Sequence, residues 1–258
     1  MPYFLRTFPR RSRPVLGLLL LLMAFSGCRL YEPPRYERLK FAPGAPETRV
    51  LMIGDSLTYY NDLPGLLQQF SAGEAAPIFI EDHTTPLAAL SQHWAMGDAA
   101  QRIATGRFDY VVLQDFSRKP VTDAEECLKY FVLFDEVVKR AGGKTLVFQN
   151  WTRRDLEKDY PALEKTYGTI IDRTQARLAP IGAAWKLCAA ERPDIALLLD
   201  DRHPTDAGSY LAACVLYDVI YNKKSAALPA DRPGPKLPAS VLLALRSIAD
   251  RTANPVAP

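Results

Sequence analysis

Five short apolar runs at fairly even spacing constrain the fold of this chain more than any other feature. They are Val50–Ile53, Ile78–Ile80, Tyr110–Leu113, Thr145–Phe148 and a less regular run near Pro180–Ala183. Apolar and polar residues hardly alternate within them, which is typical of strands that are buried on both faces of a parallel sheet. The segments between them show helical periodicity. This order predicts the α/β class, with a doubly wound parallel sheet, right-handed crossovers and helices on both faces.

The helices are predicted from the recurrence of apolar residues at helical spacing. They are expected near Leu63–Ala72, Trp94–Ala104, Asp123–Ala141 and Tyr160–Leu178, and then at Asp206–Tyr221 and about Ala239–Asp250. A chain of 258 residues, 48% of them hydrophobic, can bury a sizeable core. We therefore expect one globular domain over residues 48–250 and a short tail at 251–258.

The first 28 residues have the pattern of an export signal. Arginines precede the apolar run Val15–Phe25, which is shorter than the ~20 apolar residues that span a bilayer. The sequence "FSGC", which ends at Cys28, resembles the bacterial lipobox, although leucine is commoner than Phe25 at its first position. A lipidated Cys28 would anchor the protein to a membrane of the cell envelope, in the periplasm or at the cell surface. A plain signal peptide or an uncleaved anchor is the alternative. Residues 29–47 are Pro-rich and polar, as expected of a tether.

The net charge of +3 arises from the export signal, because without its four arginines the rest of the chain carries about −1. A nucleic-acid partner is therefore not expected, since such proteins normally show a basic face. Only Cys127, Cys188 and Cys214 follow Cys28, and their odd number and spacing argue against a disulfide framework or a zinc site. We expect neither a metal nor a cofactor.

A serine stands where the first apolar run ends. Gly54-Asp55-Ser56 follows that run directly, so Ser56 is predicted at the carboxyl end of a strand, where open α/β sheets bind their ligands. Ser56 could instead merely cap a helix, because serine and aspartate are good N-cap residues. A serine hydroxyl becomes a useful nucleophile only when a neighbouring base takes its proton.

His203 is the candidate for that base. It lies in the polar loop "LLDDRHPTDAGSY", before a predicted helix, and it is one of three histidines. Asp200 precedes it by three residues, a spacing that lets a turn bring the carboxylate to the imidazole nitrogen that faces away from the serine. Asp201 is the alternative carboxylate. The strand-end serine, the Asp-x-x-His-Pro spacing and the order Ser…Asp…His together indicate a catalytic triad.

The motifs "GDSLT" and "DDRHP" resemble those of the SGNH/GDSL hydrolase superfamily, which comprises esterases and lipases of flavodoxin-like α/β/α fold. The resemblance covers about residues 48–222. It implies that Ser56 is the nucleophile, that His203 is first the general base and then the acid, and that Asp200 orients His203.

The chain departs from the superfamily at the oxyanion hole, which is built from the serine N–H, a glycine N–H after the second strand and an asparagine in a Gly-x-Asn-Asp loop. The second run is followed by "EDHTTPLAALSQHW", which lacks that glycine, so the backbone N–H of Leu87 or Ala88 would have to serve. Gln114 stands in the place of the asparagine and has the same amide donor. The alternative for Gln114 is a strand-end residue that bonds nearby backbone. We thus predict oxyanion donors at Ser56, Ala88 and Gln114.

Other residues near the strand ends are candidates for further roles. Asn150 and Trp151 follow the fourth run and are candidates for substrate contact, because they should face the same edge of the sheet. His83 is not expected to chelate a metal with its neighbours, since adjacent strand residues point to opposite faces. His93 is expected to pack against or cap a helix.

The sequence therefore predicts a serine esterase that needs no cofactor and acts on small-molecule or polymer esters, such as acetylated carbohydrate or lipid esters. The alternative is a non-catalytic envelope lipoprotein that keeps the fold and binds a ligand, because its oxyanion hole is altered.

Overall fold

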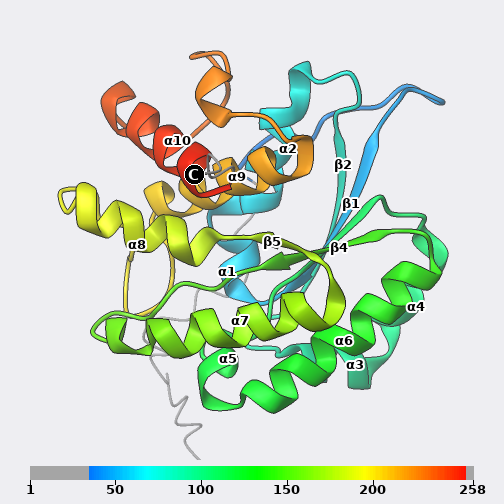
Figure 1. The fold of residues 1–258 in the computed structure, drawn as a ribbon. Coiled ribbons are helices and arrows are strands. Elements are labelled where there is room, and N and C mark those ends of the chain that lie inside the picture. The colour runs from blue at the N-terminus through cyan, green and yellow to red at the C-terminus, as the bar shows by residue number, and fades with distance from the viewer. Residues whose placement is uncertain (1–34, 254–258) are drawn as a thin grey trace, which may run out of the picture.

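The centre of the protein is a sheet of five parallel strands in the order β2-β1-β3-β4-β5 (Figure 1). The computed structural model describes residues 35–253. The strands are β1 (Thr48–Gly54), β2 (Ile78–Thr84), β3 (Tyr110–Leu113), β4 (Lys144–Phe148) and β5 (Arg177–Ala179). The predicted α/β/α fold with a parallel sheet is confirmed.

Ten helices connect and follow these strands in the described part of the chain. They are α1 (Ser56–Tyr59), α2 (Leu63–Phe70), α3 (Leu90–Met96), α4 (Asp98–Gly106), α5 (Lys119–Thr122), α6 (Ala124–Arg140), α7 (Tyr160–Thr174), α8 (Ile181–Glu191), α9 (Asp206–Tyr221) and α10 (Ala239–Ala253). Short 3₁₀ segments lie at Tyr60–Asp62, Ser71–Gly73, Glu157–Asp159 and Ser225–Ala227.

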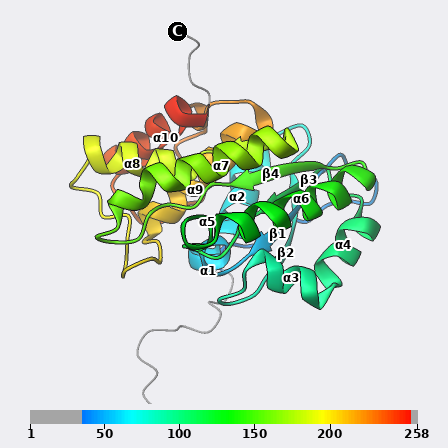
Figure 2. The same cartoon turned by 60° about the horizontal axis from the view of Figure 1, so that its bottom comes forward.

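The helices form two layers, one on each face of the sheet (Figure 1). Val50 and Met52 of β1 pack toward α2, α8, α9 and α10, whereas Leu51 and Ile53 pack toward α3, α4, α6 and α7. Figure 2 shows the same two layers from another side. Burial on both faces explains why the strand sequences are continuously apolar.

Two predicted elements differ from the structure near the fifth strand. The strand was expected at Pro180–Ala183 but lies at Arg177–Ala179, and α8 begins directly after Pro180. The predicted helix Tyr160–Leu178 ends earlier, because Gln175 adopts a left-handed φ of 56° that closes α7. Proline has no N–H to donate to a sheet, so position 180 suits the turn between strand and helix.

The predicted helix Trp94–Ala104 is in fact two helices, α3 and α4. Gly97 lies between them with a φ of 81°, a left-handed conformation that ends α3 and that glycine adopts without strain. The chain therefore turns at this residue instead of continuing in one helix.

The described part of the expected tether is attached to the domain. The Asp62 carboxylate accepts hydrogen bonds from the backbone N–H groups of Arg35 and Tyr36 at 2.8 and 2.9 Å, and it pairs with Arg38 at 2.7 Å. The predicted export signal and Cys28 lie outside the described residues, as do residues 254–258. Within residues 35–253, the helices are all too short or too polar to cross a bilayer.

Candidate active site

Ser56 is the first residue of α1 and follows β1 through a tight turn. Asp55 caps the helix, because its Oδ1 accepts a hydrogen bond from the Leu57 N–H at 2.9 Å. A Cβ atom at Gly54 would overlap the Thr58 hydroxyl, so this position requires glycine. The local sequence thus places a serine at the carboxyl edge of the sheet.

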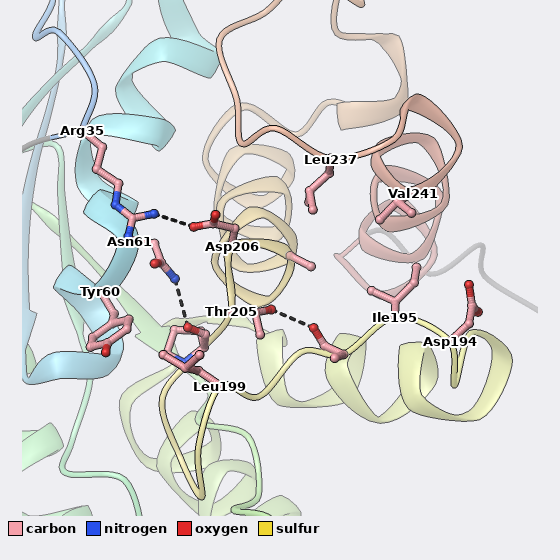
Figure 3. Close-up of a pocket in the computed structure, with 13 residues that line it drawn as sticks. Arg35, Tyr60, Asn61, Asp194, Ile195, Leu199, Thr205, Asp206, Leu237 and Val241 are labelled. Atoms are coloured by element: carbon pink, nitrogen blue, oxygen red, sulfur yellow. Dashed lines mark hydrogen bonds and ion pairs between the residues drawn. The ribbon is translucent and has the colours of Figure 1, made fainter. Parts of the chain in front are cut away.

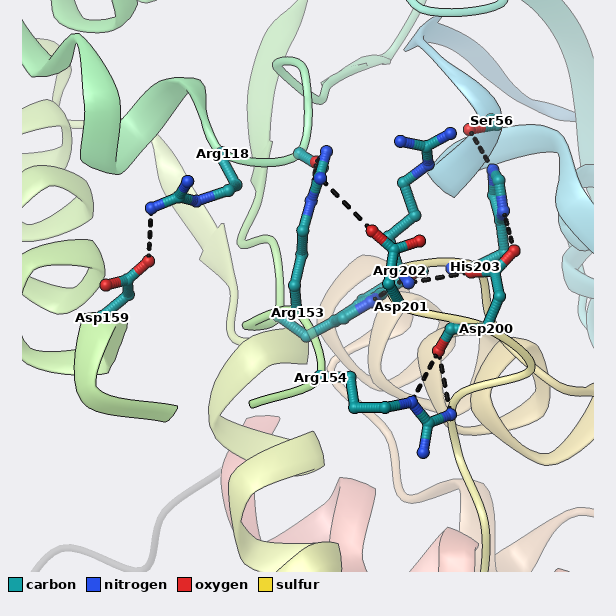
Figure 4. A network of polar contacts seen from close by, with 11 residues as sticks. Ser56, Arg118, Arg153, Arg154, Asp159, Asp200, Asp201, Arg202 and His203 are labelled. Atoms are coloured by element: carbon teal, nitrogen blue, oxygen red, sulfur yellow. Dashed lines mark hydrogen bonds and ion pairs between the residues drawn. The ribbon is translucent and has the colours of Figure 1, made fainter. Parts of the chain in front are cut away.

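The structure brings Ser56, His203 and Asp200 into one line of hydrogen bonds (Figure 4). His203 Nε2 lies 3.1 Å from Ser56 Oγ, and His203 Nδ1 lies 2.6 Å from Asp200 Oδ2. The other carboxylate oxygen of Asp200 accepts the backbone N–H groups of Arg202 and His203, both at 2.8 Å. The three-residue spacing closes a turn that fixes the carboxylate against the ring.

Asp201, the alternative carboxylate, lies outside this line. Its side chain is 58% exposed, and its Oδ2 is 3.4 Å from Arg153 Nη1. The structure therefore places Asp200, and not Asp201, against the imidazole.

The electrostatics of Asp200 suit a partner for an imidazolium. Burial tends to raise the pKa of Asp200, but the hydrogen bonds from the His203 ring and from the backbone N–H groups of His203 and Arg202 lower it to about 2. The carboxylate is therefore ionised at neutral pH. It can hold the Nδ1 proton and stabilise positive charge on the ring.

Two residues outside the sequence motifs, Tyr60 and Arg154, support the His203 loop. The Tyr60 ring stacks on the His203 imidazole with centroids 4.7 Å apart and planes 14° from parallel. Arg154 donates from Nε and Nη2 to the Asp200 carbonyl at 3.1 and 2.9 Å, and from Nη2 to the Leu198 carbonyl at 3.2 Å. Sequence reasoning missed both residues, because their role depends on contacts between segments that are distant in the chain.

Gln114 does not occupy the predicted oxyanion position. Its side chain is fully buried, and its Oε1 accepts hydrogen bonds from the Asp55 N–H at 2.7 Å and from the Thr58 hydroxyl at 2.8 Å. Its amide nitrogen donates to the Asp115 carbonyl. The prediction is corrected accordingly: the amide holds the turn that carries Ser56, and the alternative reading of a backbone-bonding strand-end residue fits the geometry.

The predicted Ala88 amide is also engaged elsewhere. Its N–H donates to the Thr85 carbonyl at 3.2 Å and closes a turn after β2. Leu87, the alternative, has a left-handed φ of 64° and a side chain that is half exposed. This backbone conformation is the one that favours glycine, the residue the superfamily has in this loop.

Asn150, one of the two candidates for substrate contact, has its amide nitrogen bonded to backbone carbonyls. It is fully buried and donates from Nδ2 to the Asp115 and Ser117 carbonyls at 2.8 and 3.1 Å. It therefore connects the loop that follows β4 to the loop that follows β3. Trp151 donates from Nε1 to the Arg202 carbonyl at 2.9 Å. Its ring stacks on that of Trp185, with centroids 3.9 Å apart. Both residues are buried and support the loops around the site, and their contact with substrate stays a prediction.

The other two histidines lie beside the site without reaching Ser56. His93 is buried with its Nε2 3.0 Å from the Gly54 carbonyl, and burial lowers its pKa. His83, near the end of β2, has its Nε2 3.3 Å from the carboxylate of Asp98, the first residue of α4. His93 and Gln114 thus bond neighbouring backbone groups, the Gly54 carbonyl and the Asp55 N–H, where β1 ends.

A cavity of about 560 Å³ lies next to the Tyr60 and His203 loop (Figure 3). Its lining includes the apolar residues Leu199, Pro204, Ile195 and Val241 together with Tyr60. Arg35, Asp194 and Asp206 also line it, so the cavity beside Tyr60 and the His203 loop has both apolar and charged walls.

Comparison with known proteins gives matches among solved structures only, since no family model and no curated protein matches the chain. A protein from Slackia heliotrinireducens, provisionally assigned as an SGNH hydrolase, is 26% identical, with a TM-score of 0.58, over 67% of this chain and 99% of that one. A DUF4886 family protein from Bacteroides uniformis is 15% identical, with a TM-score of 0.61, over 81% and 96% of the two chains. The acetyl xylan esterase AlAXEase is 14% identical, with a TM-score of 0.57, over 67% and 99%.

These structures share the α/β/α fold of this chain, and the Slackia heliotrinireducens protein is 26% identical to it in sequence. The sequence resemblance at Ser56 and His203 agrees with this fold. The chain is thus similar to SGNH/GDSL hydrolases in its fold and in the motifs around Ser56 and His203.

Proposed function

We propose that the protein is a serine esterase that hydrolyses carboxylic esters through an acyl-serine intermediate on Ser56. The observation that carries this proposal is the unbroken line from Ser56 Oγ to His203 Nε2 at 3.1 Å and from His203 Nδ1 to Asp200 at 2.6 Å. A base within hydrogen-bond reach of the nucleophile, itself oriented by a third group, is the arrangement that activates a serine.

In the first half of the reaction, Ser56 Oγ attacks the ester carbonyl carbon while its proton passes to His203 Nε2. The tetrahedral intermediate then collapses, the bond to the alcohol oxygen breaks, and that oxygen takes the proton from Nε2. Asp200 stabilises the imidazolium between these two events, since its pKa of about 2 keeps it ionised.

In the second half, water attacks the acyl-serine and gives a proton to His203 Nε2. Collapse of the second tetrahedral intermediate releases the acid and returns the proton to Ser56 Oγ. The chemistry needs no group beyond water and these three side chains, together with donors for the oxyanion.

The oxyanion donors that we propose are the backbone N–H groups of Ser56 and Leu87. Gln114 and Ala88 both use their amides in other hydrogen bonds, whereas the left-handed Leu87 sits in the loop where the superfamily has a glycine. Backbone N–H groups that point at the developing charge stabilise the transition state more than the resting ester.

The substrates proposed are small-molecule or polymer esters, including acetylated carbohydrate and lipid esters. A similar fold in an acetyl xylan esterase supports the carbohydrate class. The cavity beside Tyr60 could receive the acyl or alcohol group. Export and lipid anchoring at Cys28 are likewise proposed, on the sequence pattern alone.

Fluorophosphonate labelling followed by peptide mass spectrometry tests the proposal. We expect one covalent adduct on Ser56, no adduct in Ser56→Ala, and release of acetate from a simple aryl acetate by the wild type. No adduct and no acetate release would favour a non-catalytic binding protein of the same fold, in which Ser56 and His203 are bonded but the oxyanion is not stabilised.

A further inference from the structure

Arg202 is a cationic side chain beside the candidate nucleophile that has no carboxylate partner within residues 35–253. It precedes His203 in the chain and is half-buried. Its Nε is buried without a hydrogen-bond partner, and the hydrogen bonds and ion pairs of the described residues include none from its guanidinium. Figure 4 shows the side chain extending in the same direction as His203, toward the level of Ser56.

Electrostatic coupling places the Arg202 charge close to the turn that carries Ser56. Burial raises the pKa of Asp55 to about 7, and the Arg202 charge is among the groups that oppose this rise. A carboxyl group with that pKa is only partly ionised at neutral pH. Among the ion pairs of the described residues, Asp55 forms none with Arg202.

Arg153 is the second cation of this group, and its main contact is a neutral oxygen. Its Nε and Nη2 donate to the Ser117 hydroxyl at 3.1 and 2.9 Å, while its closest carboxylate, Asp201, lies 3.4 Å away and is largely exposed to solvent. Burial lowers the pKa of Arg153, and the nearby charge of Arg202 lowers it further. The two guanidinium groups are thus near enough to repel each other.

The other arginines of Figure 4 have partners of their own. Arg118 pairs with Asp159 at 2.9 Å, and Arg154 donates to backbone carbonyls. Arg202 therefore differs from them, because no hydrogen bond or ion pair of the described residues involves its guanidinium, and Arg153 has only the long contact with the exposed Asp201 carboxylate. A half-buried charge without a partner reduces stability, so its presence next to a reactive site calls for a functional reason.

We propose that Arg202 and Arg153 together bind an anionic group of the substrate, so that the preferred esters carry a carboxylate or a similar anion close to the bond that is cleaved. This inference rests on the proposed esterase function and specifies its substrate class. Guanidinium groups suit the task, because their planar donors match the two oxygens of a carboxylate and keep their charge at any physiological pH.

The anion could belong to the acyl or to the alcohol part of the ester, and two substrate pairs distinguish these cases. Monophenyl succinate carries the carboxylate on the acyl part, and 4-acetoxybenzoate carries it on the alcohol part. Each is compared with its methyl ester, which is neutral and nearly the same shape, while phenyl acetate reports the basal activity.

We expect the wild type to prefer one anionic ester over its neutral counterpart by about tenfold in kcat/KM at low salt. This preference should shrink with added sodium chloride, because salt screens the attraction. Arg202→Gln should abolish the preference and Arg202→Lys should keep part of it. The control is Arg140→Gln, which removes one exposed charge on α6 and should leave both the preference and phenyl acetate turnover unchanged.

Binding to the Ser56→Ala protein separates this inference from the esterase proposal. Calorimetry should detect the preferred anionic ester, and Ser56→Ala/Arg202→Gln should bind it at least about tenfold more weakly. Equal kcat/KM for anionic and neutral esters in the wild type, or an unchanged preference in Arg202→Gln, would overturn the anion site. Absence of hydrolysis with retained, Arg202-dependent binding would overturn the esterase function and leave the anion site standing.

Discussion

Tyr60 lies almost parallel to His203, with ring centroids 4.7 Å apart and an angle of 14° between the planes. Tyr60 belongs to the same turn and 3₁₀ segment that follow Ser56, so the segment that presents the nucleophile also fixes the plane of the base. A ring held in one plane keeps Nε2 directed at Ser56 Oγ, which a freely rotating ring would not do.

Removal of the Tyr60 ring should lower activity without changing the chemistry. We expect Tyr60→Ala to reduce kcat for an aryl acetate about fivefold, because a stacked aromatic pair contributes about 1 kcal/mol. Tyr60→Phe retains the ring and should stay within about threefold of the wild type. Steady-state kinetics on the two variants checks this, and equal losses in both would show that the stacking is not the cause.

The three hydrogen-bonded residues should behave as a unit. In other serine hydrolases, loss of the nucleophile or the base costs ~10⁶-fold in kcat, and an asparagine in place of the orienting aspartate costs ~10⁴-fold. We expect losses of this order for Ser56→Ala, His203→Ala and Asp200→Asn, with melting temperatures close to that of the wild type. Asp201→Asn is the matched control and should retain most activity, so a larger loss there than in Asp200→Asn would reassign the carboxylate.

Gln114 should contribute to stability as well as to activity. Gln114→Met leaves the Asp55 N–H and the Thr58 hydroxyl without their acceptor in a buried place, which should lower the free energy of unfolding by about 1–3 kcal/mol. Gln101→Met, at an exposed position of α4, should change it by less than about 0.5 kcal/mol. Chemical denaturation measures both. A fully stable Gln114→Met enzyme with a kcat lowered ~10²-fold would instead restore the oxyanion role.

A buried pair of carboxyl groups at the base of α9 should make stability depend on pH. Burial, together with a hydrogen bond and charge from Asp250, raises the pKa of Asp218 from 3.8 to about 9. The folded protein thus holds a proton that the unfolded chain releases near pH 4. The stability that this proton provides is full below that pH and declines as the pH rises toward 9. We expect the melting temperature to fall between pH 6 and pH 9 and to fall less in Asp218→Asn; identical slopes would contradict this.

Lipidation at Cys28 is testable independently of catalysis. Cells grown with a labelled fatty acid should yield labelled wild-type protein in the membrane fraction, whereas Cys28→Ala should be unlabelled and remain a precursor if processing fails. Firm anchoring requires more than one acyl chain, because a single chain holds a protein only marginally. Unlabelled wild-type protein would exclude the lipid anchor.

The sequence predicted the sheet well because its strands are buried on both faces, which produces continuous apolar runs. It misplaced the fifth strand, since Arg177–Ala179 is a short edge strand and carries little of that pattern. The position of α8 was missed for a related reason: its residues are apolar almost throughout, so the helical period is weak.

At the site, the roles that could be predicted are those of residues placed by their neighbours in the sequence. Asp200 could be paired with His203 because one turn of loop connects them. Ser56 could be placed because it directly follows the end of a strand. The roles of Gln114 and Arg202 depend on residues that only the tertiary fold brings close to them. Neither residue belongs to a sequence motif that would indicate its role. The amide of Gln114 is equally able to face a ligand or a backbone group, and only packing decides.

The attachment of residues 35–39 to the domain changes how far an anchored enzyme could travel. Arg35 and Tyr36 bind Asp62, six residues after Ser56 along the chain. If Cys28 is anchored, only residues 29–34 of the tether would lie between the anchor and the domain. Six residues span at most about 20 Å when fully extended. Such a short tether would confine the proposed enzyme to esters within a few nanometres of the bilayer surface. Esters farther from the membrane would not reach its active site.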